Sequence, residues 1–511
     1  MSELNKSIPV IDLFAGPGGL GEGFSAFKRP ELDRPFKIRL SIEKDYHAHQ
    51  TLQLRSFFRQ FSEKKAPEEY YGYLKGEISF TALGKRYPCE MDAATQEAWR
   101  AELGVTDQNA VDQRIEAALG GTDKWVLIGG PPCQAYSLVG RSRNGGTNPD
   151  DARLYLYREY LRIIATHSPT VFIMENVKGL LSSRINNELI FDKILSDLRC
   201  PTTAVNNSPA IPSENEYNLF SLVNRSSETA SGWKELDPRD FIIRSEEYGI
   251  PQARHRVIIL GLRKDLSTSR VGILAPSAQV TASEILKGLP RLRSGLSKAK
   301  DNWVAWQAAL AHYPVHSKDS VSKMVWDVIG KMPYGECTRG ADFIDTPAGQ
   351  MSADLSSWFI DDRICGVCNH SSRGHMAEDL YRYLFTACYA QINGRSPTLQ
   401  EFPQKLLPRH KNVSKAINGG HFEDRFRVQV GSRPSTTITS HIAKDGHYYI
   451  HPDPSQCRSL TVREAARLQT FPDNYFFEGP RTEQYKQVGN AVPPLLARQI
   501  AQIVFDVLLA V

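Results

Sequence analysis

The stretch SIPVIDLFAGPGGL, residues 7–20, decides the fold of this chain. Its first half, 7–14, is an apolar run typical of a buried strand, and its second half is a glycine-rich turn that leads toward a helix. Glycines at such a turn let the backbone approach a ligand that a Cβ would exclude. Taken alone, the segment could also be a tight turn without a ligand.

Outward from this stretch, short apolar runs alternate with helix-period segments through the first half of the chain. We expect further strands and intervening helices at 36–43, 46–61, 125–128, 153–167, 170–174 and 256–262. This alternation predicts an α/β fold built on a doubly wound, mostly parallel sheet. Ligands of such sheets bind beyond the carboxyl ends of the strands.

The alternation stops after residue 262, because 263–458 is rich in Ser, Pro, His and basic residues. Regular helical patterns return at 460–470 and 493–509. We therefore predict a first domain at 1–262, a second, smaller domain at 263–458, and a C-terminal segment at 459–511 that completes the first. The last helix should pack back onto that first domain.

Composition limits the possible functions. The chain has 511 residues, 41% of them hydrophobic, and a formal net charge of +5, which permits nucleic-acid binding without demonstrating it. The eight cysteines have no repeating spacing, and neither a secretory leader nor an apolar run of about 20 residues is visible. We expect a soluble, cytoplasmic protein with no membrane segment, associated with the nucleoid if it is bacterial.

The ends of the first two strands indicate the cofactor class. Glu43 ends the second strand, where a carboxylate suits a pair of ribose hydroxyls, although a solvated surface charge is the common alternative. The lysine and hydroxyl residue of a phosphate-binding loop do not follow the glycines of residues 16–19. A nucleoside without phosphates, such as S-adenosylmethionine, therefore fits best, and a hydride cofactor remains open.

Three further segments carry reactive side chains near strand ends. They are GGPPCQAYS at 129–137 with Cys133, TVFIMENV at 170–177 with Glu175, and YGIPQARHR at 248–256 with Arg254 and Arg256. A carboxylate after four buried apolar residues needs a partner or a task, and two arginines at alternate positions of a strand face one side. A structural cysteine and a salt bridge from Glu175 to an arginine are the simpler alternatives.

These segments together resemble the motif set of the DNA cytosine-C5 methyltransferase family of the restriction-modification type. The matches run in the family's order and include DLFAGPGGL from Asp12, PPCQ around Cys133, LTVREAARLQTFP from Leu460 and QVGNAVPP from Gln487. The resemblance covers nearly the whole chain. PPCQ and QVGNAVPP are its most specific parts.

The resemblance implies an activity and a site. The activity is methyl transfer from S-adenosylmethionine to a flipped cytosine of duplex DNA, with Cys133 as the nucleophile and Glu175, Arg254 and Arg256 as the other catalytic residues. The residues implied in cofactor binding are Phe14, Gly16, Gly18, Leu20, Glu43, Glu77, Ile78, Pro132, Leu156, Asn490 and Val492. Residues 263–458 become a target-recognition domain, and Arg463 is expected to buttress it structurally.

Some features depart from the family pattern. About 50 residues separate the best match to the adenine-binding motif, Glu77 with Ile78, from PPCQ, which is long for a compact α/β unit. Residues 200–237 are interpreted as a surface excursion. Cys365, Cys368, His370 and His375 are too tightly spaced for a full tetrahedral zinc site, so we expect no metal. Residues 433–441 suit phosphate contacts, and plain β-structure explains them equally well.

Two other functions remain possible. An RNA cytosine-C5 methyltransferase could use the same fold, although the long recognition domain argues for duplex DNA. A non-catalytic DNA-binding relative could keep the scaffold, although the joint presence of Cys133, Glu175, Arg254 and Arg256 argues against it. We expect a monomer, with a cognate restriction endonuclease as its genetic partner.

Overall fold

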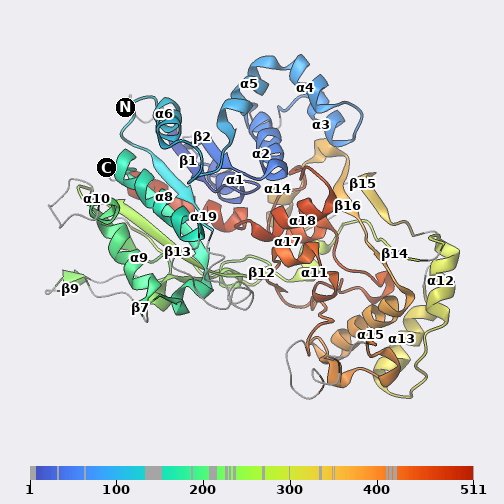
Figure 1. Ribbon diagram of the computed structural model, residues 1–511. Coiled ribbons are helices and arrows are strands. Elements are labelled where there is room, and N and C mark those ends of the chain that lie inside the picture. Colours follow the sequence, from blue (N-terminus) through green and yellow to red (C-terminus); the bar gives the residue numbers. More distant parts are fainter. Residues whose placement is uncertain are drawn as a thin grey trace.

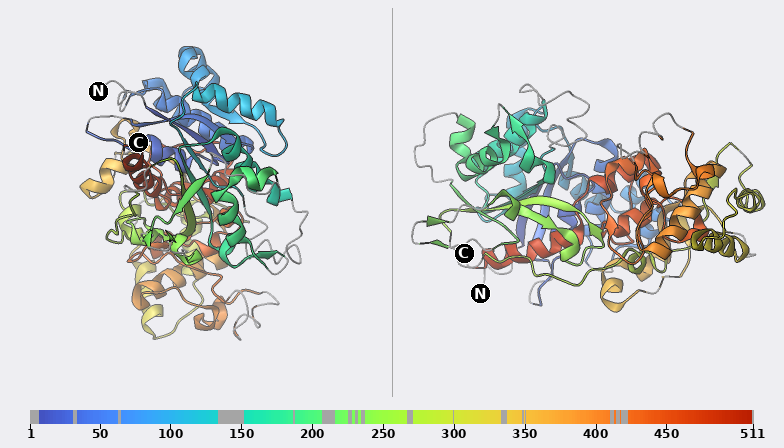
Figure 2. Two further views of the ribbon diagram at one scale, coloured as in Figure 1. Left: turned by 90° about the vertical axis from the view of Figure 1, so that its left-hand side faces the viewer. Right: turned by 90° about the horizontal axis from the view of Figure 1, so that it is seen from below.

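The computed structural model describes most of the chain. The described residues are 7–30, 34–62, 65–132, 152–185, 188–206, 216–224, 228–229, 232–233, 237–266, 271–298, 300–332, 337–347, 349, 351–409, 413, 417 and 423–509. They form two lobes: a sheet-based lobe holds both described ends of the chain, and helices from the middle of the sequence build the other (Figure 1). Residues 460–490 lie between the two lobes (Figures 1 and 2).

A central sheet organises the first lobe. Among the described residues it contains β1 (Ile8–Leu13), β2 (Phe36–Glu43), β3 (Ala98–Arg100), β4 (Val126–Gly129), β5 (Val171–Val177), β8 (Tyr217–Phe220), β11 (Ile242–Arg244) and β13 (His255–Arg263). Its order is β11-β13-β5-β4-β1-β2-β3, with β8 also on β13. The neighbouring strands β5, β4, β1, β2 and β3 are parallel to one another. The strand β13 runs antiparallel to its neighbours β5, β8 and β11. The predicted doubly wound, mostly parallel sheet is confirmed.

Helices cover both faces of this sheet. Alternate residues of β1 point to opposite faces, with Val10 in one core and Ile11 in the other. The helices that pack on the Val10 face are α1 (Gly19–Ser25) and α19 (Pro494–Leu508). The helices on the Ile11 face are α6 (Gln108–Leu119), α8 (Ala152–His167) and α9 (Ile190–Arg199).

The C-terminal helix packs onto the first lobe, as predicted. A Cβ at Gly23 of α1 would overlap the Cβ of Ala497 in α19, so glycine permits this close packing. The run Arg481–Leu508, made of α18 (Arg481–Asn490) and α19, is apolar and long enough to cross a membrane by length and composition. However, 72% of its most apolar window is buried inside the protein, which is typical of a core helix.

A three-helix insertion separates β2 from β3. After α2 (Tyr46–Arg59) come α3 (Glu68–Leu74), α4 (Phe80–Arg86) and α5 (Pro88–Glu97). Its aromatic side chains form a core with the second half of α2, around Phe57 and Tyr70. Phe343 and Cys368 from the middle of the chain join this core, so the insertion also contacts the region between the lobes.

The middle of the chain divides between two cores. The core of the second lobe contains α12 (Trp303–Ala311), α13 (Ser320–Gly330) and α15 (Ala377–Asn393). By contrast, α11 (Ala282–Leu286) and α14 (Ala353–Phe359) pack with α17 (Val462–Leu468) and α18, together with Ile438 and Ile442. We call this second core the hub. Residues 263–458, which the sequence predicts to be one domain, therefore contribute both to the core of the second lobe and to the hub.

Short strands pair outside the central sheet. The pairs are β6 (Arg184–Ile185) with β7 (Glu188–Leu189), β9 (Glu228–Thr229) with β10 (Gly232–Trp233), β12 (Gln252–Ala253) with β18 (Ser435–Thr436), β14 (Gly295–Leu296) with β17 (Gly374–His375), and β15 (Gly340–Asp345) with β16 (Gly366–Ser371). The pairing of β12 with β18 ties residues 433–441 to the sheet lobe. Within these residues, Thr437 Oγ1 donates to the carbonyl of Ala253.

The expectation of a surface excursion at 200–237 was partly wrong. Residues 201–206 form α10 (Pro201–Asn206), and β8 adds to the central sheet beside β13. Tyr217 and Phe220 of β8 are buried, because their side chains complete the cores on the two faces. A polar composition therefore did not exclude a buried strand.

Candidate active site

The glycine-rich turn after β1 is fixed by the end of β2. The amide of Ala15 donates to the carbonyl of Ile42 at 3.1 Å, and the amide of Gly16 donates to Glu43 Oε2 at 2.8 Å. Gly16 and Gly18 have φ of 56° and 89°, which explains the need for glycine at both positions. Phe14 also has a positive φ, of 55°, which non-glycine residues rarely adopt.

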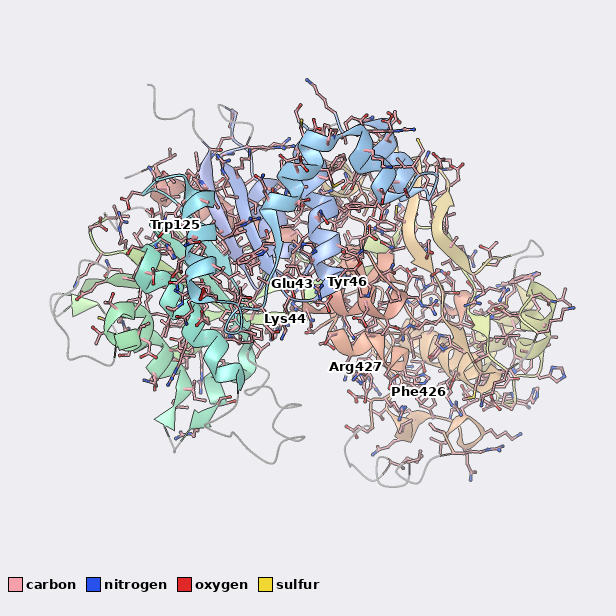
Figure 3. All side chains as sticks on the ribbon, turned by 45° about the horizontal axis from the view of Figure 1, so that its top comes forward. Glu43, Lys44, Tyr46, Trp125, Phe426 and Arg427 are labelled. Atoms are coloured by element: carbon pink, nitrogen blue, oxygen red, sulfur yellow. The ribbon has the colours of Figure 1, made fainter. Side chains whose placement is uncertain are left out.

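Glu43 is the last residue of β2 and lies beside Lys44 and Tyr46 (Figure 3). Its Oε1 accepts the amide of Asp45 at 2.7 Å, so each carboxylate oxygen is held by one backbone donor and keeps further lone pairs. Burial raises the pKa of Glu43 above its usual value, and the two backbone hydrogen bonds oppose that rise. The next residue, Lys44, pairs with Glu102 at 3.0 Å.

The last motif of the chain meets the first at this turn. A Cβ at Gly19 would overlap the carbonyl oxygen of Val492, so the start of α1 touches the turn after α18. Leu20 and Val492 are buried in one core, and Asn490 is an exposed residue at the end of α18. The structure thus brings together predicted site residues that lie more than 470 positions apart.

The structure does not place Glu77 and Ile78 beside the glycine-rich turn. Both lie in the turn between α3 and α4, where Glu77 is exposed and Ile78 packs in the aromatic core with Phe57 near the far end of α2. The strand beside β2 is β3, and it leads into residues 101–103. Leu156 lies over that segment, because a Cβ at Gly104 would be 3.5 Å from its Cδ2.

The residues before the predicted nucleophile lie against Glu175. Cys133 itself lies outside the described residues, as do Gln134 to Ser137. A Cβ at Gly130 would be 2.9 Å from Glu175 Oε2, and Asn176 Nδ2 donates to the carbonyl of Pro131 at 3.3 Å. Pro132 is half-buried at the end of the same segment. The chain therefore leaves β4 directly beside the end of β5.

Glu175 forms an ion pair with Arg256, with Nε 2.9 Å from Oε1. Both side chains are mostly buried, at 14% and 13% exposure. Desolvation lowers the pKa of Arg256, and the neighbouring Glu175 partly offsets this. The salt bridge from Glu175 to an arginine, which the sequence left as an alternative, is thus present, and its carboxylate lies beside Gly130.

Arg254 takes a different position from Arg256. It is 2% exposed, its Nη1 donates to the carbonyl of Ile438 at 2.8 Å, and its Nη2 donates to that of Gly489 at 3.2 Å. Burial lowers the pKa of Arg254, and the charge of Arg256 adds to this effect. The expectation that both arginines serve one pocket alike needs correction, because Arg254 lies between β12 and β13, where strand alternation is interrupted.

Arg463 has the structural role expected for it. Its guanidinium is fully buried and donates to the carbonyls of Cys368, Pro472 and Tyr475 at 2.7–3.0 Å. It therefore links β16 to the segment after α17.

Asp12 is a buried carboxyl beneath the turn. It is 1% exposed, and neither oxygen has a hydrogen-bond partner among the described residues. Burial raises its pKa to about 8, and nearby Arg59 opposes that rise. The carboxyl is therefore mostly protonated at neutral pH.

The CxxC segment is not arranged as a metal site. Both ring nitrogens of His370 are engaged, by Thr461 Oγ1 at 2.8 Å and by the carbonyl of Pro290 at 3.0 Å. Within the part of the chain that the structure describes, no group of three or more His, Cys, Asp or Glu could hold a metal ion.

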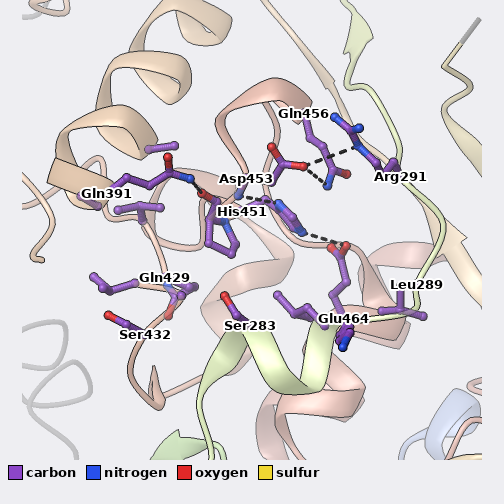
Figure 4. Close-up of a pocket in the computed structure, with 18 of the residues that line it drawn as sticks. Ser283, Leu289, Arg291, Gln391, Gln429, Ser432, His451, Asp453, Gln456 and Glu464 are labelled. Atoms are coloured by element: carbon purple, nitrogen blue, oxygen red, sulfur yellow. Dashed lines mark hydrogen bonds and ion pairs between the residues drawn. The ribbon is translucent and has the colours of Figure 1, made fainter. Parts of the chain in front are cut away.

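A cavity of about 550 Å³ lies between α11, the end of α15 and residues 428–432 (Figure 4). Its polar wall is internally paired: His451 Nε2 lies 3.4 Å from Glu464 Oε1, and the amide of Asp453 donates to His451 Nδ1. None of the predicted site residues lines it.

The structure places several residues beside the predicted site residues that the sequence did not single out. Residues 101–103 follow a strand of three residues, which is too short for a detectable period. Gln252 and Gln469 are completely buried next to the site. Their segments, YGIPQARHR and LTVREAARLQTFP, also contain charged residues, so no local pattern singled out the two glutamines.

Comparisons with known proteins show the family to which this sequence is similar. Residues 72–200 and 240–506 match the family model described as C-5 cytosine-specific DNA methylase. Type II methyltransferase M.Bpa9945I of Bacillus paralicheniformis is 33% identical over 98% of this chain and 99% of its own length. DNA (cytosine-5-)-methyltransferase M.ApeKI of Aeropyrum pernix is 28% identical over 77% of this chain and 83% of its own length.

Proposed function

The chain belongs to the C-5 cytosine-specific DNA methylase family, and from this premise we propose which residues carry out methyl transfer to C5 of a flipped cytosine in duplex DNA. The enzyme is a DNA (cytosine-5-)-methyltransferase of the restriction-modification type, as its relatives are. One observation supports the assignment above all: the Glu175–Arg256 pair lies against Gly130, three residues before Cys133.

Cys133 is the proposed nucleophile. C5 of cytosine is a poor nucleophile. The Cys133 thiolate therefore first forms a bond to C6, and the electron pair of the C5–C6 double bond is displaced into the ring, which makes C5 nucleophilic. C5 then takes the methyl group, its proton leaves, and cleavage of the S–C6 bond restores the ring. The cytosine must leave the base stack to reach this position.

Glu175 and Arg256 would stabilise the adduct. Addition at C6 places negative charge on N3 and O2 of the ring. The guanidinium of Arg256 can donate to this charge as it stands, and the carboxyl of Glu175 can donate once it carries a proton. The ion pair aligns the guanidinium beside the carboxyl group before the base arrives. Arg254 would act indirectly, by positioning the segments around the site and not by contacting the cytosine, because its Nη atoms already donate to two backbone carbonyls.

The residues of the turn suit S-adenosylmethionine. The acceptor oxygens of Glu43 fit a ribose diol, and residues 15–23 contain no lysine or arginine for a phosphate. We propose Phe14, Gly16, Gly18, Leu20, Glu43, Ala101, Glu102, Leu103, Pro132, Leu156, Asn490 and Val492 as the binding residues. When bound, the cofactor supplies a methyl group activated by a sulfonium.

Recognition of the DNA sequence is proposed for the second lobe. Its core, around α12, α13 and α15, contains none of the proposed cofactor residues. The hub residues of 263–458 would instead position that lobe against the sheet. A cognate endonuclease, a monomeric state and a cytoplasmic location complete the proposal. The RNA and non-catalytic alternatives are not favoured by the family match.

Trapping on 5-fluorocytosine tests the proposal. Fluorine cannot leave C5 as a cation, so duplex DNA with 5-fluorocytosine at the target should give a denaturant-resistant complex only when S-adenosylmethionine is present. Cys133→Ser should abolish this complex, because a hydroxyl is a much weaker nucleophile than a thiolate. Cys89→Ser, at an exposed thiol of α5, is the matched control and should trap normally. Trapping that persists in Cys133→Ser would contradict the assignment.

A further inference from the structure

A buried amide holds the turn that completes the cofactor side of the site. Gln469 follows α17 and has no exposed surface. Its Nε2 donates to the carbonyl of Val488 at 2.7 Å and to that of Ala491 at 3.2 Å. These two carbonyls lie on either side of Asn490 in sequence. Gln469 therefore fixes the backbone from which Asn490 and Val492 project, which we call the cofactor turn (Val488–Val492).

A second buried amide continues from the first toward the proposed cytosine pocket. Gln252 Nε2 donates to Gln469 Oε1 at 2.9 Å and to the carbonyl of Leu468 at 3.2 Å. Its Oε1 accepts the amide of Ile438 at 2.8 Å. All four N–H groups and both oxygens of the two amides are thus engaged, and one lone pair on each oxygen is left over. Gln252 lies four residues before Arg256, and we call Gln252–Arg256 the pocket strand.

Arg254 joins the same two elements a second time. It starts from the pocket strand and donates to the carbonyls of Ile438 and Gly489. A Cβ at Gly489 would overlap the backbone of Thr439 and Ser440, so the two segments that Arg254 bridges are in direct contact. The amide pair and the guanidinium therefore form a buried loop that closes through the backbone, in which Arg254 Nε and one lone pair on each amide oxygen have no partner among the described residues.

We propose that Gln252 and Gln469 are positioning residues that hold the cofactor turn and the pocket strand in one register. The inference rests on the proposed function. Buried networks in which every group is satisfied are rigid, and loss of one partner leaves the others unpaired. Transfer between two separately bound molecules is sensitive to displacements of about 1 Å, so this link sets the rate of the chemical step.

Replacement by methionine tests the link at nearly constant volume. Gln469→Met and Gln252→Met each remove one amide, and the double variant removes both. Trapping on 5-fluorocytosine DNA counts the active molecules, and a single-turnover assay with normal DNA then gives the methylation rate for each active molecule. We expect that rate to fall at least tenfold in each single variant. The double variant should be no slower than the slower single variant, because loss of either amide already removes the Gln252–Gln469 hydrogen bond, and Arg254 alone does not hold the register.

Gln484→Met is the matched control. Gln484 lies on α18 and is mostly buried, but it donates only to the carbonyl of Gly479, outside the loop. Its rate for each active molecule should stay within twofold of the wild type. Should Gln469→Met not fold, Gln469→Asn keeps the amide but withdraws it from the cofactor turn, and the same tenfold loss is expected.

Two results would overturn the inference. A loss confined to the number of active molecules, with an unchanged rate for each, would mean that the glutamines only stabilise the fold. Losses that multiply in the double variant would mean that the two amides act separately. Failure of the proposed function would look different, because wild-type protein would then trap no DNA at all.

Discussion

Replacement of Glu43 by alanine should weaken binding of S-adenosylmethionine without affecting the cytosine pocket. The carboxylate holds the amides of Gly16 and Asp45 at 2.8 and 2.7 Å, so loss of these two contacts mainly lowers the stability of the turn. The part specific to the cofactor is the ribose diol, which would lose its acceptor. A buried hydrogen-bonding group that loses its partner costs about 1–3 kcal/mol of binding free energy, which corresponds to roughly a 5- to 150-fold increase in Kd.

Isothermal titration calorimetry measures this change, and thermal denaturation confirms that the variant is folded. Glu43→Gln is the matched control, because it keeps one oxygen and the side-chain volume, and its loss should be smaller. Burial raises the pKa of Glu43, so wild-type affinity should fall as the pH drops through that raised pKa, whereas the affinity of Glu43→Gln should not. A folded Glu43→Ala protein that binds the cofactor within twofold of the wild type would refute the reasoning.

Exchange of residues 263–458 for the equivalent segment of a related enzyme should change which DNA sequence is methylated, and cofactor affinity should stay within about twofold. Digestion with methylation-sensitive nucleases reads the methylated sequence. An unchanged target sequence would contradict this assignment of the recognition domain. The stability of Asp12→Asn relative to the wild type should increase as the pH rises from about 4 to 8. In this range the Asp12 carboxyl ionises freely in the unfolded wild-type chain but must keep its proton in the folded one, because its pKa there is raised to about 8, so only the wild type loses stability. Urea denaturation at several pH values measures this, and a constant difference would disprove it. Arg463→Leu should lower the free energy of unfolding by about 3–5 kcal/mol, since three buried carbonyls lose their donor; a loss below about 1 kcal/mol would exclude the buttressing role.

Long, regular elements of the sheet lobe could be predicted from the sequence. The strand expected at 36–43 has those bounds in β2, and the helix expected at 153–167 is α8 within one residue. These segments are long enough to show their period, and their packing partners are the nearest elements in the chain. The end of β2 also located Glu43 correctly beside the glycine-rich turn.

The remaining features depend on distant contacts. β3 has only three residues, so the match at Glu77 was taken for the segment that follows it. The division of 263–458 between the second lobe and the hub is set by packing against α17 and α18, which lie outside that stretch. Arg254 and Arg256 alternate in sequence, but the break between β12 and β13 separates their surroundings. Local pattern does not report such breaks.

The packing of α1 against α19 has a consequence during synthesis. A ribosome makes α1 (Gly19–Ser25) long before α19 (Pro494–Leu508), so the partner that covers this helix is absent while most of the intervening chain is made. Until then Leu20 and Phe24 lack the apolar surface that buries them in the finished protein. The nascent chain therefore cannot pack α1 and the cofactor turn together until α18 and α19 have been made.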